Sequence, residues 1–226
     1  MRVEADWLRF EALTRTKSVV AAGLDLEVKD RAGEYRLSVP DLRGEEYQDL
    51  WVTGTESKHV ADAAAAASGA LLFVRADSLV ESTPLETVQI RQLPEDEHGD
   101  LTKWDPDRAA TQTKLCAVLE AFEIVELPIG VVVTAWDTVS DPTQDVSFWL
   151  QRRLPLLWQM LETRATFKVF AVSAQGGDLG DQKIVERLAS HDDPAARLVD
   201  PQVRIGGDLT EPIGWLRQHG PMAGAA

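Results

Sequence analysis

Two short, continuous runs of apolar residues constrain the fold of this chain more than any other feature. Gly69–Arg75 and Ile129–Thr134 each lack the regular polar alternation of a strand that faces water on one side. Such runs are typical of strands buried on both faces, which occur in parallel sheets covered by helices on both sides. Phe167–Val172 is expected to add another strand. The sequence therefore predicts an α/β fold with a mostly parallel sheet.

A hairpin is expected before these strands. Residues 19–30 alternate between apolar and charged side chains and predict a half-buried strand, and residues 31–34 are typical of a tight turn. Tyr35–Val39 then forms the antiparallel second strand. Helices are predicted at residues 1–18, 45–67, 108–122, 145–163, 182–190 and 211–218. Within residues 145–163, Pro155 is expected to kink the helix.

The length of the chain suits a single domain. Of its 226 residues, 1–219 are assigned to one domain and 220–226 to a flexible tail. Residues 76–107 form a long connection between elements, and its second half, which contains Pro94–Asp100, is acidic. Loops of this length tend to be functional or disordered.

Composition limits the partners of the protein. The net charge of −14 disfavours nucleic acids and anionic membranes, because both would repel the chain. It permits a basic protein partner, and a nucleotide bound as its Mg²⁺ complex. The single cysteine, Cys116, suits a reducing cytoplasm and is expected to be buried in a helix. We found no signal region and no apolar run of about 18 residues, and therefore expect a cytoplasmic protein.

Polar residues follow the second apolar run, in Thr134-Ala-Trp-Asp137. Ligands of open α/β sheets bind at the carboxyl ends of strands, so Asp137 would face such a site. Its carboxylate could accept two hydrogen bonds from the N1–H and N2–H₂ of guanine. The alternative is that Asp137 caps the following turn. Trp136 could stack on a base or simply pack within the loop.

Small residues follow the next strand, in Ser173-Ala-Gln-Gly-Gly177. Their backbone N–H groups could approach a flat ring and donate to an acceptor such as guanine O6. An ordinary glycine turn is the alternative. A third polar strand end comes earlier in the chain, where Asp41 follows the 35–39 strand and Gly44 and Glu45 open a helix.

In their order along the chain, Asp41–Glu45, Thr134–Asp137 and Ser173–Gly177, the three strand ends resemble the motifs of small-GTPase-like domains. Thr134–Asp137 and the closing Asp208–Leu216 are more similar to bacterial double-GTPase domains, found in conflict and defence-associated gene systems. The resemblance implies a three-layer fold with Ras-like strand order, and Mg²⁺ and GTP as ligands. It further implies roles for individual residues: Asp41 for Mg²⁺, Gly44 for the γ-phosphate, Glu45 for the attacking water, and Thr134, Trp136, Asp137, Ser173 and Ala174 for guanine.

The sequence departs from that family at its phosphate loop. No Gly-x-x-x-x-Gly-Lys-Ser/Thr motif occurs, and no glycine is followed by lysine. Four charge-assisted hydrogen bonds of about 1.5–3 kcal/mol would be worth roughly 6–12 kcal/mol. Nanomolar binding totals about 12 kcal/mol. We therefore expect these 226 residues alone to bind GTP at millimolar concentration or not at all.

The missing loop also removes the first strand of the family's sheet, which lies between the 35–39 and 69–75 strands. The exposed strand edges would carry a heavy backbone penalty. Residues 1–20 could cover the gap, a partner chain could donate a strand, or the native protein could be longer. Two functions therefore stay open. The first is a GTPase-like domain completed by a phosphate-loop segment, and the second is a degenerate pseudo-GTPase that acts as an interaction scaffold.

Overall fold

The structure is a computed structural model. It describes residues 23–30, 33–39, 44–81, 109–121, 127–141, 144–163, 166–173, 177, 181–190 and 210–220. The predicted helix at 1–18, the acidic stretch at 94–100 and the tail beyond residue 220 lie outside these ranges.

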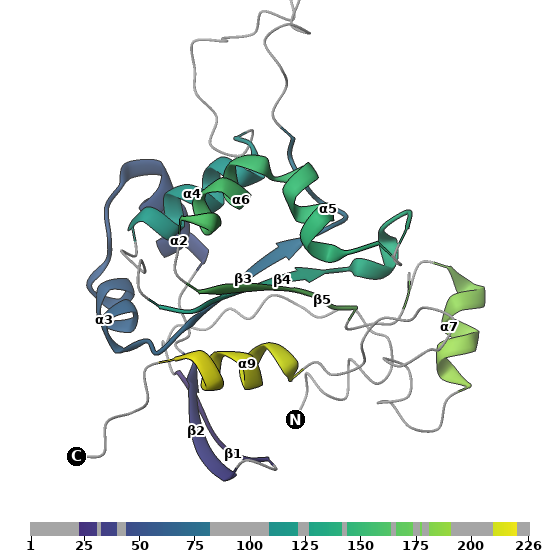
Figure 1. The fold of residues 1–226 in the computed structure, drawn as a ribbon, viewed down its shortest axis with the longest axis horizontal. Coiled ribbons are helices and arrows are strands. Elements are labelled where there is room, and N and C mark those ends of the chain that lie inside the picture. Colours follow the sequence, from purple (N-terminus) through teal and green to yellow (C-terminus); the bar gives the residue numbers. More distant parts are fainter. Residues whose placement is uncertain are drawn as a thin grey trace, which may run out of the picture.

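The centre of the fold is a three-stranded parallel sheet (Figure 1). Its strands are β3 (Ala70–Arg75), β4 (Ile129–Thr134) and β5 (Phe167–Ala171), in the order β3-β4-β5. Every residue of β4 up to Val133 is buried, as expected for a strand covered on both faces. The predicted α/β class and the parallel sheet are confirmed.

Helices cover the sheet on both sides (Figure 1). On one side lie α2 (Gly44–Thr53), α4 (Thr111–Ala121), α5 (Val146–Arg153) and α6 (Pro155–Glu162). On the other side lies α9 (Glu211–His219), whose Trp215 packs edge-on against Phe170 of β5. α3 (Lys58–Ala66) and α7 (Gln182–Ala189) lie toward opposite ends of the molecule.

The main core lies between the sheet and the α4, α5 and α6 layer. Leu150, Leu157 and Leu161 are fully buried there against Val131 and Val133. Cys116 of α4 belongs to the same cluster and is buried, as predicted. Among the described residues, no helix is long and apolar enough to cross a membrane.

The predicted helix at 45–67 is wrong in its continuity, because the chain forms α2 and α3 instead. Gly54 has a φ of +66°, a left-handed conformation that glycine adopts without strain and that ends helices. Ser57 then starts α3, since its hydroxyl accepts a hydrogen bond from the backbone N–H of Val60 at 3.2 Å.

The predicted helix at 145–163 is divided as well. Leu154 leaves the helical conformation, with φ −133° and ψ 60°, and Pro155 becomes the first residue of α6. Proline is favourable there because the first helical N–H has no partner within the helix. Pro155 therefore begins a second helix rather than kinking one.

The predicted hairpin is confirmed as β1 (Leu24–Asp30) and β2 (Gly33–Val39), paired antiparallel. It forms a separate two-stranded sheet, beyond α9 from the parallel sheet (Figure 1). The guanidinium of Arg217 on α9 lies 4.4 Å from the ring centre of Tyr35 on β2. The hairpin is more exposed than the predicted half-buried strand, with Leu26 41% exposed.

β3 is the open edge of the parallel sheet, as far as the described residues show. Val74 faces the helical core and is 1% exposed, whereas Phe73 on the opposite face is 62% exposed. The prediction that this strand is buried on both faces is therefore wrong for β3. Its apolar sequence fits a buried strand, but no described element covers Phe73.

Candidate functional site

The carboxyl end of β4 carries the predicted Thr134–Asp137 motif. Thr134 is the last residue of the strand, and a short 3-10 helix, Trp136–Thr138, follows directly. Ala135 connects the two with φ 54° and ψ 37°, and it is the only described residue other than glycine with a positive φ. A left-handed alanine is sterically costly, and such positions concentrate at functional sites. The sharp turn directs the chain away from the sheet, and Asp137 in this turn is half-buried.

The side chain of Trp136 points into the protein core. It is 2% exposed and packs edge-to-face on Trp149 of α5, with ring centroids 5.6 Å apart. A ring buried in this way presents no free face on which a base could stack. The structure thus fits the packing alternative for Trp136, which anchors the turn that carries Asp137.

The carboxyl end of β5 lies directly beside this turn. The backbone N–H of Trp136 donates to the carbonyl oxygen of Val172 at 3.3 Å, and the N–H of Val172 donates to Val133 O at 2.8 Å. Ser173 follows and is 4% exposed, one of two buried polar side chains that the structure describes. Ala174 lies outside the described ranges. The β4 and β5 strand ends predicted to contact guanine are therefore hydrogen-bonded neighbours.

The carboxyl end of β3 lies on the other side of β4, and the sequence predicts no role for it. Ala76 N–H donates to Thr134 O at 3.0 Å, which continues the strand pairing by one residue. At the same strand end, Nη2 of Arg75, the last residue of β3, lies 2.6 Å from Asp77 Oδ2. The hydrogen bonds from Arg75 lower the pKa of the Asp77 carboxyl. The signal in the sequence was a pair of opposite charges two residues apart, at the end of the apolar run that forms β3.

The predicted metal and phosphate residues are only partly described. Gly44 is the first residue of α2, where helical N–H groups lack partners within the helix. Asp41 and the side chain of Glu45 lie outside the described residues. The adjacent Glu46 is described: it is 8% exposed, and its Oε1 accepts a hydrogen bond from Ser57 Oγ at 2.9 Å. Among the residues described, no group of three or more metal-binding side chains is found.

These observations define a parallel α/β domain with polar residues at the carboxyl ends of adjacent strands, where ligands of such sheets bind. The family model Double-GTPase 1 matches residues 1–216, and the chain therefore belongs to this family. It is a GTPase-like domain, as the resemblance of the motifs implied. No curated protein and no solved structure matched the sequence.

Proposed function

We propose that this domain binds guanine nucleotides with Mg²⁺, and hydrolyses GTP when a phosphate-loop segment completes it. The observation that carries the proposal is the hydrogen bond between Trp136 N–H and Val172 O, at 3.3 Å. It holds the turn with Asp137 next to the strand end with Ser173. Family membership supports GTP and Mg²⁺ as the ligands.

Guanine recognition rests on Asp137 in this proposal. Its carboxylate accepts hydrogen bonds from N1–H and N2–H₂ of the base, a pattern that adenine lacks. Backbone groups at Ser173 and Ala174 support the other edge of the ring. Thr134 ends the strand and positions the turn, and buried Trp136 holds that turn in place. A rigid support of this kind is what a precise hydrogen-bonding group requires.

Phosphate and metal chemistry rest on the start of α2. Unpaired N–H groups and the helix dipole make helix N-termini favourable for phosphate. Gly44, the first helical residue, would donate to the γ-phosphate. Asp41 would hold Mg²⁺, directly or through water, and Glu45 would help to place the attacking water. Mg²⁺ would neutralise charge that develops on the phosphate oxygens.

The completing segment is proposed to cover β3. This strand is the open edge of the sheet among the described residues, and its Phe73 is 62% exposed. An added strand would pair with the backbone of β3, and a following helix would cover Phe73. Both are the ordinary means by which a parallel sheet buries its edge and its face. We further propose a role in a bacterial conflict or defence system, because Thr134–Asp137 and Asp208–Leu216 resemble motifs of double-GTPase domains found in such systems.

A second function is supported by the same exposed surface and by the sequence. The chain contains no phosphate-loop motif, and its net charge is −14. A pseudo-GTPase scaffold would use the domain for protein contacts, with a basic partner favoured by charge.

Titration of the purified 226-residue protein with a fluorescent GTP analogue and Mg²⁺ separates the two functions. The first proposal expects weak, millimolar binding that strengthens when the completing segment is supplied. Sub-micromolar binding by the chain alone would exclude the pure scaffold. Complete lack of binding with the completed domain would exclude the GTPase.

A further inference from the structure

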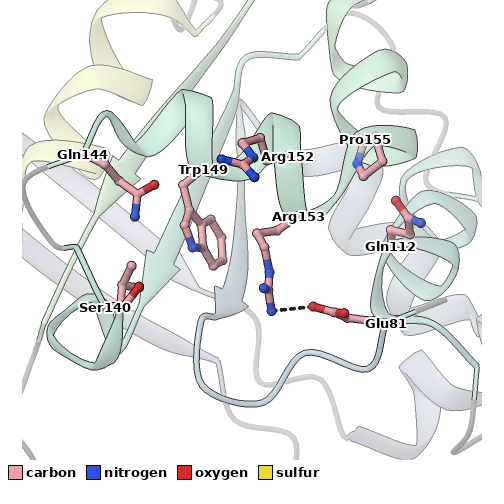
Figure 2. Close-up of a pocket in the computed structure, with 9 residues that line it drawn as sticks. Glu81, Gln112, Ser140, Gln144, Trp149, Arg152, Arg153 and Pro155 are labelled. Carbon is pink, nitrogen blue, oxygen red and sulfur yellow. Dashed lines mark ion pairs between the residues drawn. The ribbon is translucent and has the colours of Figure 1, made fainter. Parts of the chain in front are cut away.

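A pocket of about 570 Å³ opens beside the carboxyl ends of β3 and β4 (Figure 2). It lies between the segment that follows β4, the last turn of α5 and the start of α6, with Glu81 on the opposite wall. Its volume is within the range of small-molecule sites. Neither Asp137 nor Ser173 lines it, so it is separate from the proposed guanine site.

Two adjacent arginines from α5 give the pocket positive charge. Arg153 Nη2 lies 2.5 Å from Glu81 Oε1, while both side chains remain about half exposed. Arg152 has no carboxylate within ion-pair distance among the described residues, and its guanidinium lies 5.6 Å from the ring centre of Phe148. In a chain with a net charge of −14, an arginine without an acidic partner is notable.

Neutral polar groups complete the polar side of the pocket. Gln144 uses Nε2 to donate to Asp141 O at 2.9 Å, and its side-chain oxygen has no partner in the described part of the chain. The hydroxyl of Ser140 likewise has no described partner and lies near Gln144 in the close-up (Figure 2). These groups can donate to or accept from a bound ligand.

Gln112 also lines the pocket, and three apolar residues complete it. Trp149 is 7% exposed and its ring packs against Trp136, so only a small part of its side chain can contact a ligand in the pocket. Val139 and Pro155 add apolar surface. The lining is therefore more polar than apolar, and its apolar side chains offer a limited surface for the body of an organic anion.

We propose that this pocket binds a small organic anion, with a carboxylate or phosphate on Arg152 and an apolar body against Trp149 and Pro155. The planar guanidinium matches both kinds of anion, because its N–H groups can pair with two oxygens at once. Exposed ion pairs contribute little to stability, so the anion can also compete with Glu81 for Arg153.

The test uses the full 226-residue protein and NMR spectra of its tryptophan indole N–H groups. The probes are phenyl phosphate and benzoate, with inorganic phosphate and neutral benzyl alcohol for comparison. We expect saturable shifts of the Trp149 signal with both aromatic anions, weaker binding of phosphate, and weakest binding of benzyl alcohol. The two aromatic probes distinguish a phosphate from a carboxylate ligand.

Variants assign the effect to the pocket. Arg152→Gln should weaken the binding of both aromatic anions at least tenfold. Arg36→Gln, on the distant hairpin, should leave their affinity unchanged. Glu81→Gln should strengthen binding several-fold because it releases Arg153, and a merely misfolded variant would not show this gain. Shifts that do not saturate, equal binding of benzyl alcohol, or wild-type affinity in Arg152→Gln would each overturn the proposal.

Discussion

Trp136 donates its backbone N–H to the carbonyl oxygen of Val172 at 3.3 Å, just beyond the last paired residues of β4 and β5. The side chain of the same residue is buried against Trp149. One residue therefore ties the turn with Asp137 both to the neighbouring strand end and to the core. Any ligand that contacts Asp137 would meet a turn whose position is set by packing rather than by the ligand.

Replacing Trp136 by alanine should lower the free energy of unfolding by about 3–5 kcal/mol, because a fully buried aromatic side chain is removed from the core. Phe148→Ala is the matched control: this side chain is 51% exposed, and its loss should cost much less. Urea denaturation followed by circular dichroism measures both. Weaker nucleotide binding by Trp136→Ala at unchanged stability would instead indicate that the ring stacks on the base.

Two glycines without close neighbours should respond to alanine in opposite ways. Gly54 has a φ of +66°, so Gly54→Ala should destabilise the protein by about 1 kcal/mol, although nothing lies within 4 Å of the added carbon. Gly214, inside α9, has equally open surroundings. Gly214→Ala should stabilise by about 0.5–1 kcal/mol through helix propensity. Thermal unfolding midpoints that move in the same direction would contradict this account.

Ser57 links the two helices that replace the predicted single one. Its hydroxyl accepts from Val60 N–H and donates to the buried Glu46 carboxylate at 2.9 Å. Ser57→Ala removes a helix cap, which should cost about 1–2 kcal/mol. Ser57→Thr keeps the hydroxyl and should recover most of that loss in denaturant unfolding. Equal losses of unfolding free energy in the two variants would show that the hydroxyl does not stabilise the helix start.

The hairpin contains an acid-sensitive pair. Hydrogen bonds from Arg36 and Ser38 lower the pKa of Asp25 below its ordinary value of 3.8. A lowered folded-state pKa means that the pair stabilises the hairpin above about pH 3.8 and loses that contribution as the pH falls through the folded pKa. Carbon NMR titration of the Asp25 carboxyl in wild type and Arg36→Gln measures this. The variant should titrate at higher pH; an unchanged midpoint would remove Arg36 as the cause.

The strands were predictable because their signal is local. Ile129–Thr134 is buried almost throughout, so its sequence contains the apolar run that identifies it. The division of the helices at Gly54 and Leu154 was also signalled, by a glycine and by Pro155. Those signals compete with the helical periodicity on either side, and that longer pattern predicts a single helix.

Features that depend on distant parts of the chain were not predictable in the same way. The apolar sequence of β3 is the same whether or not another element covers Phe73, so its 62% exposure had no sequence signal. The pocket likewise brings Glu81 and Arg153 together from positions far apart in the sequence. By contrast, the sequence did indicate that the residues after β4 and β5 could contact one ligand, because ligands of open α/β sheets bind at the carboxyl ends of strands.

Guanine recognition by Asp137 is the basis of the proposed function, and a change of base preference tests it most directly. Saturation-transfer NMR detects millimolar binding, so the protein can be studied with GTP and xanthosine triphosphate, each with Mg²⁺. Wild type should prefer GTP, and Asp137→Asn should shift the preference toward the xanthine nucleotide, since an amide can donate to the xanthine oxygen. Asp141→Asn, an exposed carboxylate near the same turn, is the control and should keep the preference for GTP. A preference for GTP that survives Asp137→Asn would contradict the account.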